Sequence, residues 1–132
     1  MLFTFVWSPR RVPVTHVSGR HARIDVTLDG IRFTRSEADA ARRRTERVQD
    51  LAWDQVAGAT VQVSRKGRAV IRVAVVGAPA VDHHRDDPYA LKVPRKSTAA
   101  VPELVDRINA EVDARHRWRE AVREGGDPTP TG

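Results

Sequence analysis

The stretch from residue 47 to residue 76, RVQDLAWDQVAGATVQVSRKGRAVIRVAVV, most constrains the fold of this chain. It contains two runs rich in β-branched residues, at 59–63 and 70–76, on either side of the pair Lys66-Gly67. Such runs flanking a short turn predict a β-hairpin. Trp53 stands just before it, and we expect its ring to fill one end of the core while its indole N–H donates to a backbone carbonyl.

A second hairpin is predicted upstream, in residues 23–35, RIDVTLDGIRFTR. Apolar and polar residues alternate on both sides of Asp29-Gly30, a pair typical of a type I′ turn. The alternation predicts one face that points toward the core, formed by Ile24, Val26, Leu28, Ile31 and Phe33. Shorter strands are expected around Val48 to Leu51 and over Tyr89 to Val93, the latter with Leu91 and Val93 inward.

Beyond these strands, an amphipathic helix is expected to start between Thr98 and Pro102. Its apolar stripe has the spacing of a helix that packs on a sheet and consists of Val101, Leu104, Val105, Ile108 and Val112. Trp118 falls off the stripe, so the last turns should extend beyond the sheet before Gly125 and Gly126 end the helix.

Together these elements describe a mainly β, α+β domain: a strongly bent antiparallel sheet, or partly open barrel, of six or seven strands, capped by one C-terminal amphipathic helix. The order of elements, with Trp53, Asp54 and Val56 after a strand, resembles the bacterial pleckstrin-homology-like (PH-like) domains over about residues 20 to 118. The resemblance implies a non-enzymatic scaffold that recruits or assembles a protein partner. It also implies a seventh strand, which we expect in residues 1–7 or 77–90.

The 132 residues suffice for one domain. We expect it at residues 23–124, after an N-terminal extension or edge strand at 1–22 and before a disordered tail at 125–132. The apolar segment Leu2 to Trp7 has no assured place in the core, which leaves a homodimer through this segment open.

Positive charge indicates an alternative function. The net charge is +6, and 20 of the 23 basic residues are arginine. Such a chain can bind anionic membrane lipid or nucleic acid, although an arginine-rich surface without a ligand would show the same composition. The candidate ligand- or partner-binding residues are Arg42, Arg43, Arg44, Arg47, Arg65, Lys66 and Arg68. We expect the Arg42 to Arg44 triplet in a solvated loop, with a helical turn over Glu37 to Arg43.

Motifs for catalysis are absent. The chain has no cysteine and lacks a G-x-S-x-G motif, a glycine-rich phosphate loop and an H-E-x-x-H motif. We therefore predict no enzymatic activity, no catalytic residue and no cofactor. The lack of cysteine and of an apolar run near the roughly 20 residues of a membrane span favours a cytoplasmic protein, with peripheral membrane association as the alternative.

The loop at residues 77–89 holds the weak candidates for a metal site, Asp82, His83, His84 and Asp86. Imidazole and carboxylate are ligand types for Zn²⁺, so a metal-dependent activity at Asp82 to Asp87 is the least favoured alternative. Adjacent residues rarely converge on one ion. We prefer a hydrogen-bonded surface loop in which aspartate caps the turn before Pro88.

Overall fold

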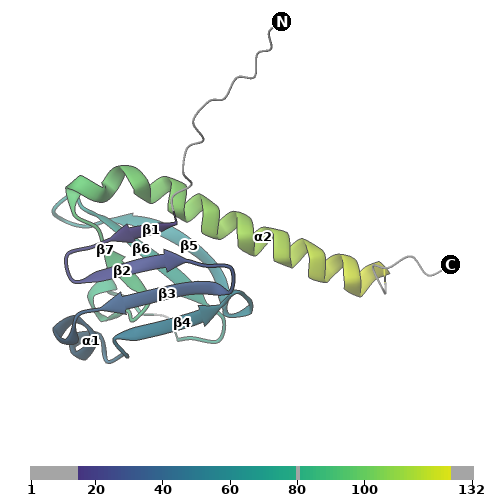
Figure 1. Ribbon diagram of the computed structural model, residues 1–132, viewed down its shortest axis with the longest axis horizontal. Coiled ribbons are helices and arrows are strands. Elements are labelled where there is room, and N and C mark those ends of the chain that lie inside the picture. The colour runs from purple at the N-terminus through teal and green to yellow at the C-terminus, as the bar shows by residue number, and fades with distance from the viewer. Residues whose placement is uncertain (1–14, 80, 126–132) are drawn as a thin grey trace, which may run out of the picture.

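Two antiparallel sheets form the body of the protein (Figure 1). The structure is a computed structural model, and it describes residues 15–79 and 81–125. The first sheet has the order β1-β2-β3-β4, with strands β1 (His16–Ser18), β2 (Ala22–Val26), β3 (Gly30–Arg35) and β4 (Val48–Ala52). The second has the order β5-β6-β7, with strands β5 (Val56–Val63), β6 (Ala69–Val75) and β7 (Ala90–Lys92).

Helices connect and cover these strands. The short helix α1 (Glu37–Arg43) joins β3 to β4, and the long helix α2 (Val101–Gly125) follows the second sheet. Short segments of 3₁₀-helix complete the described fold: η1 (Trp53–Gln55), η2 (His84–Asp86) and η3 (Arg95–Ala100). The mainly β, α+β class and the single C-terminal capping helix are confirmed. The two sheets do not close into a barrel.

The core lies between the two sheets and the first half of α2. Its largest fully buried side chains include Phe33, Ile71 and Leu91 from the strands and Leu104 and Ile108 from the helix. Burying a side chain of this size stabilises the fold by about 1.5–3 kcal/mol. The predicted helical stripe is therefore the packed face of α2.

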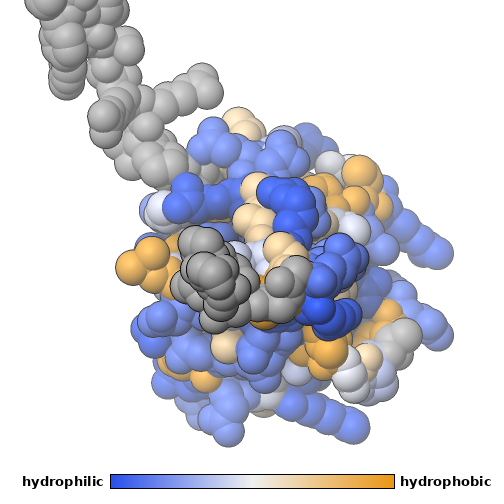
Figure 2. All heavy atoms as spheres, turned by 90° about the vertical axis from the view of Figure 1, so that its right-hand side faces the viewer, coloured by the Kyte–Doolittle hydropathy of each residue, from blue (hydrophilic) through white to orange (hydrophobic). Residues whose placement is uncertain are grey.

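Helix α2 is longer than the sheets it covers. Its second half projects from the body (Figure 1), and Trp118 in that half is 61% exposed. Figure 2 views the molecule from this side and shows mostly hydrophilic residues, with the apolar ones in small separate groups. The expected extension beyond the sheet is confirmed, and the structure describes the helix as far as Gly125. No helix within the described part of the chain is long and apolar enough to cross a membrane.

One side chain joins α2 to the edge of the second sheet. Asn109 Oδ1 accepts a hydrogen bond from the N–H of Ala59 at 2.8 Å, and Asn109 Nδ2 donates to the carbonyl of Ala59 at 2.9 Å. The amide thus pairs with β5 as a neighbouring strand would. This contact fixes the helix against the edge strand of the sheet.

Trp53 fills the core as predicted. Its side chain is 4% exposed, and its indole N–H donates to the carbonyl of Leu28 at 3.1 Å. The guanidinium of Arg115, from the first turn of the projecting half of α2, lies 5.8 Å from the indole ring. Trp53 therefore connects the β2–β3 turn to the base of the projecting helix.

The β2–β3 hairpin is confirmed, with Ile24 opposite Phe33, but its turn is not the predicted type I′ turn. Among the described residues Arg44 is the one non-glycine residue with positive φ, so Asp29 lacks the conformation that such a turn needs. Thr27 Oγ1 instead accepts from the N–H groups of Asp29 and Gly30 at 3.2 and 3.1 Å.

This turn also explains why Leu28 is 91% exposed, where we predicted a core residue. Strand β2 ends at Val26, so Leu28 no longer follows the alternation of the sheet. Glycine is required at position 30 because a Cβ there would overlap the carbonyl oxygen of Leu51 on β4, and not because the position belongs to a type I′ turn.

Among the described residues a seventh strand is present as β1, and the described part of the loop at 77–89 contains no strand. Val17 pairs with Ile24 of β2 and is 2% exposed. With three residues, β1 is too short to show alternation in the sequence. β1 is the edge strand of the first sheet and lies within residues 1–22, where an edge strand was one of our two alternatives. The segment Leu2 to Trp7 and the tail from residue 126 lie outside the described residues.

Candidate anion-binding cleft

Helix α1 places two of its charged side chains, Asp39 and Arg43, in the protein interior. Ser36 caps its N-terminus by accepting from the N–H of Asp39 at 3.2 Å, and Arg44 ends it in the left-handed conformation at φ 55°. The helix spans the residues predicted for a helical turn. The prediction that its arginines are solvated is wrong for Arg43, which is 6% exposed, because one turn of helix places Arg43 on the same inward face as Asp39.

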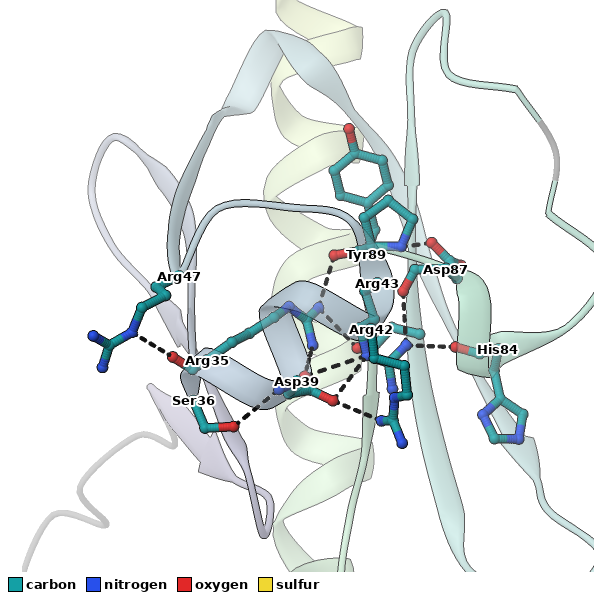
Figure 3. A network of polar contacts seen from close by, with 11 residues as sticks. Arg35, Ser36, Asp39, Arg42, Arg43, Arg47, His84, Asp87 and Tyr89 are labelled. Carbon is teal, nitrogen blue, oxygen red and sulfur yellow. Dashed lines mark hydrogen bonds and ion pairs between the residues drawn. The ribbon is translucent and has the colours of Figure 1, made fainter.

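Asp39 is the centre of a buried ionic network (Figure 3). Its carboxylate accepts from Arg35 at 2.8 Å, from Arg42 at 2.6 Å and from Arg43 at 3.3 Å. Burial acts to raise the pKa of Asp39, but the hydrogen bond from Arg35 and the charge of Arg43 outweigh it and hold the pKa below its ordinary value. Asp39 is therefore a fully ionised anchor.

The two buried arginines of the network also connect the two sheets. Arg35, on β3, donates to the carbonyls of Pro88 and Ala90 at 2.7 and 2.9 Å. Arg43, on α1, donates to the carbonyls of His84 and Asp87 at 2.6 and 2.8 Å. These bonds fasten residues 84–90, which lead into β7, to the first sheet. Burial lowers the pKa of Arg35 from its ordinary value, and the charge of Arg43 acts in the same direction.

Asp87 confirms the predicted capping of the turn before β7. Its Oδ1 accepts from the N–H of Tyr89 at 2.8 Å, and its Oδ2 accepts from Arg72 on β6 at 2.9 Å. The carboxylate is 6% exposed and is bound within the protein.

The network forms one wall of a cleft of about 810 Å³. The β1–β2 turn, α1, the β5–β6 turn, the segment before β7 and η3 all contribute residues to it. In Figure 1 the β1–β2 turn and α1 lie at the left-hand end of the molecule, opposite the projecting end of α2. A cleft of this size lies within the range of about 300–1,000 Å³ that is typical of small-molecule sites.

Cations dominate the lining of this cleft. Nine arginine and lysine side chains line it with one acidic residue, Asp39. Three of the nine are the network arginines. For the other six, no hydrogen bond or ion pair to a described residue is found, and these are Arg20, Arg68, Arg85, Lys92, Arg95 and Lys96. The described lining therefore has a strongly positive potential, because the single carboxylate of Asp39 cannot balance nine cations.

Ionisation of groups in the cleft reflects this potential. Partial burial lowers the pKa of Lys92, and the charges of Arg68 and Lys66 lower it further. His84 behaves in the same way: burial lowers its pKa from 6.5, and the charges of His83, Lys92, Arg43 and Arg72 add to the effect. Its Nδ1 is buried and has no hydrogen-bond partner among the described residues.

Only some of the site residues predicted from the sequence lie in the cleft. Arg42, Arg43 and Arg68 line the cleft. Exposed positions outside its lining are occupied by Arg44, Arg47, Arg65 and Lys66. The cleft also contains cations that sequence reasoning missed, namely Arg20, Arg35, Arg85, Lys92, Arg95 and Lys96. Of these residues, only the adjacent pair Arg95 and Lys96, which follows a proline, forms a basic cluster that the sequence could have indicated as a binding site. The other four are isolated basic residues in strands, turns and short helices.

The weak metal candidates do not form a shared site. Among residues 15–79 and 81–125, no three His, Cys, Asp or Glu side chains are grouped so that they can hold a metal ion. His83 Nδ1 accepts from the N–H of Arg85 at 3.1 Å, and the rings of His83 and His84 lie 4.6 Å apart. Asp82 and Asp86 are exposed. The loop has the hydrogen-bonded arrangement that we preferred.

Comparison of the chain with models of protein families, with curated proteins and with solved structures finds no match.

Proposed function

We propose that this chain is a non-enzymatic binding domain whose cleft takes an anionic ligand. One observation carries the proposal: nine arginine and lysine side chains meet at a cleft with a single carboxylate, which three of those arginines already share. Like charges held this close repel one another, and an anion relieves the repulsion. The ligand therefore contributes the negative charge that the lining lacks.

The chemistry of the lining supports binding rather than catalysis. Its described residues are glycine, alanine, leucine, proline, arginine, lysine, histidine and one aspartate, and no serine, threonine or cysteine among them would act as a nucleophile. The carboxylate of Asp39 is engaged with arginines and is a poor general base. The resemblance to PH-like domains, which implies a binding scaffold, points in the same direction.

The test compares two double variants that remove the same charge from different places. Arg68→Gln with Lys92→Gln changes the cleft, whereas Arg117→Gln with Arg119→Gln changes the exposed, projecting half of α2. The probe is pyrenetetrasulfonate, a fluorescent anion, titrated at several salt concentrations. We expect the affinity to fall as salt rises and to fall by roughly tenfold or more in the cleft variant alone. Equal affinities for the two variants would refute the proposal.

A second candidate function is recruitment of a protein partner through the edge of β5. Asn109 occupies this edge at Ala59, and beyond it Val61 and Val63 are 43% and 76% exposed. An edge strand with exposed β-branched residues is a surface to which another chain can add a strand. Crosslinking of the wild type and of Val63→Asp in a cell extract tests it, since the partner should be captured by the wild type only.

A further inference from the structure

We propose that the ligand of the cleft is a compact polyphosphate, meaning a molecule that carries two or more phosphate groups close together. The inference rests on the proposed function and names the chemical class of ligand for the same site. It depends on the number of unpaired cations, on their distribution around the cleft and on the absence of aromatic side chains from the lining.

The number of unpaired cations sets the charge of the ligand. Six arginine and lysine side chains in the lining have no anionic partner among the described residues. A single orthophosphate or carboxylate group can contact two or three of them and leaves the others to repel one another. A ligand with several phosphates pairs with the whole set.

The distribution of these cations requires a compact ligand. Arg20 comes from the β1–β2 turn, Arg68 from the β5–β6 turn and Lys92 from β7, while Arg95 and Lys96 begin η3. Segments far apart in the sequence thus surround one concave space of about 810 Å³. An extended polymer needs a row of cations along a groove; here they converge instead.

The types of side chain favour phosphate. Four of the six unpaired cations are arginines, whose planar guanidinium can donate two parallel hydrogen bonds to a phosphate group. Single-stranded nucleic acid is bound by stacking its bases on aromatic rings. No Phe, Tyr or Trp among residues 15–79 and 81–125 lines the cleft, so the phosphates are the part of a ligand that this described lining can recognise.

The buried network prepares the cleft for this ligand. Arg35 lines it with a side chain that is 0% exposed, and its Nε has no partner among the described residues. The bonds of Arg35 and Arg43 to backbone carbonyls hold α1 and the segment before β7 in place. The ligand therefore meets cations on a wall that is already fixed, which lowers the entropic cost of binding.

Calorimetric titration of the full chain tests the inference with four probes: tripolyphosphate, pyrophosphate, orthophosphate and citrate. We expect tripolyphosphate to bind about tenfold or more tightly than orthophosphate and citrate, with pyrophosphate between them. The preference should be lost in the Arg68→Gln, Lys92→Gln variant and kept in the Arg117→Gln, Arg119→Gln control. Citrate separates phosphate recognition from attraction to any trivalent anion.

The outcomes separate the two proposals. If all four probes bind alike and the cleft variant weakens all of them, the cleft is a general anion site; the polyphosphate inference is then wrong and the proposed function stands. If no probe binds, both are wrong. A single-stranded oligonucleotide that binds more tightly than tripolyphosphate at equal phosphate concentration also overturns the inference.

Competition identifies the source of the phosphates. Phosphatidylcholine vesicles with and without phosphatidic acid are added to the complex with tripolyphosphate. Displacement by the phosphatidic acid vesicles alone indicates a phosphate-bearing lipid headgroup, and an unchanged complex indicates a free polyphosphate. Both results keep the ligand class. Phosphatidylcholine carries no net charge, so displacement by both kinds of vesicle would show that the cleft binds a lipid surface without selecting an anionic phosphate group, and this result would overturn the inference.

Discussion

Replacing Asp39 with asparagine removes the shared negative charge of the buried network and nearly preserves its volume. Arg35 and Arg43 are 2% and 6% exposed, so their charges would remain buried without a counter-ion. Removing one partner of a buried ion pair costs about 3–5 kcal/mol. The two guanidiniums keep four hydrogen bonds to backbone carbonyls, which places the expected loss near the lower end, at about 3 kcal/mol.

Urea denaturation followed by circular dichroism measures this loss, and the thermal midpoint should fall by roughly 12 °C. Asp50→Asn is the matched control, because it removes a carboxylate from the exposed pair of Asp50 and Arg32. We expect little change for the control. Equal stabilities of the two variants would refute the view that the Asp39 network fastens the sheets together.

The same network predicts a dependence on pH. The pKa of Asp39 is lowered in the folded protein, so its contribution is fully present above the unfolded value of 3.8 and is lost as the pH falls through the folded pKa. The stability of the wild type should therefore fall below about pH 4 more steeply than that of Asp39→Asn. Parallel curves for the two proteins would contradict the ionised state of Asp39.

Three further predictions concern the turn, the helix contact and the cleft. Gly30→Ala should cost about 3 kcal/mol or prevent folding, because its Cβ would meet the carbonyl of Leu51; a stable variant in urea denaturation would contradict this. Asn109→Ala should cost about 1–3 kcal/mol by leaving the N–H and carbonyl of Ala59 unpaired, and hydrogen exchange at Ala59 should accelerate. An anion in the cleft favours protonated His84, so the affinity for pyrenetetrasulfonate, a probe of constant charge, should rise as the pH falls below about 6.5, and His84→Gln should reduce the rise.

Much of the fold could be predicted from local patterns. Three local patterns each identify one feature of the fold. The β-branched runs around Lys66-Gly67 identify a hairpin, the helical spacing of Leu104 and Ile108 identifies the packed face of α2, and the large ring of Trp53 identifies a core position. These patterns report burial along one segment. They do not identify a strand as short as β1. They also do not predict the β2–β3 turn, which is closed by hydrogen bonds to the side chain of Thr27 rather than by residues with positive φ.

The cleft could be predicted only in part, because it is assembled from distant segments. Arg42 and Arg68 were candidates as members of basic clusters in the sequence. Arg20 and Lys92 stand alone in the sequence and reach the same cleft through the pairing of strands. Arg43 shows the opposite case, because a residue within an arginine triplet is buried once helix α1 places it beside Asp39.

The central claim is that the cationic cleft is the ligand site. The most direct test is to titrate pyrophosphate into the isotope-labelled protein and to map which backbone amide resonances shift. We predict that saturable shifts are confined to residues 19–22, 35, 39, 42–43, 68, 84–85 and 91–96, the positions and segments that line the cleft. Shifts spread over the exposed arginines of α2, such as Arg117 and Arg119, or no saturable shifts at all, would contradict the claim.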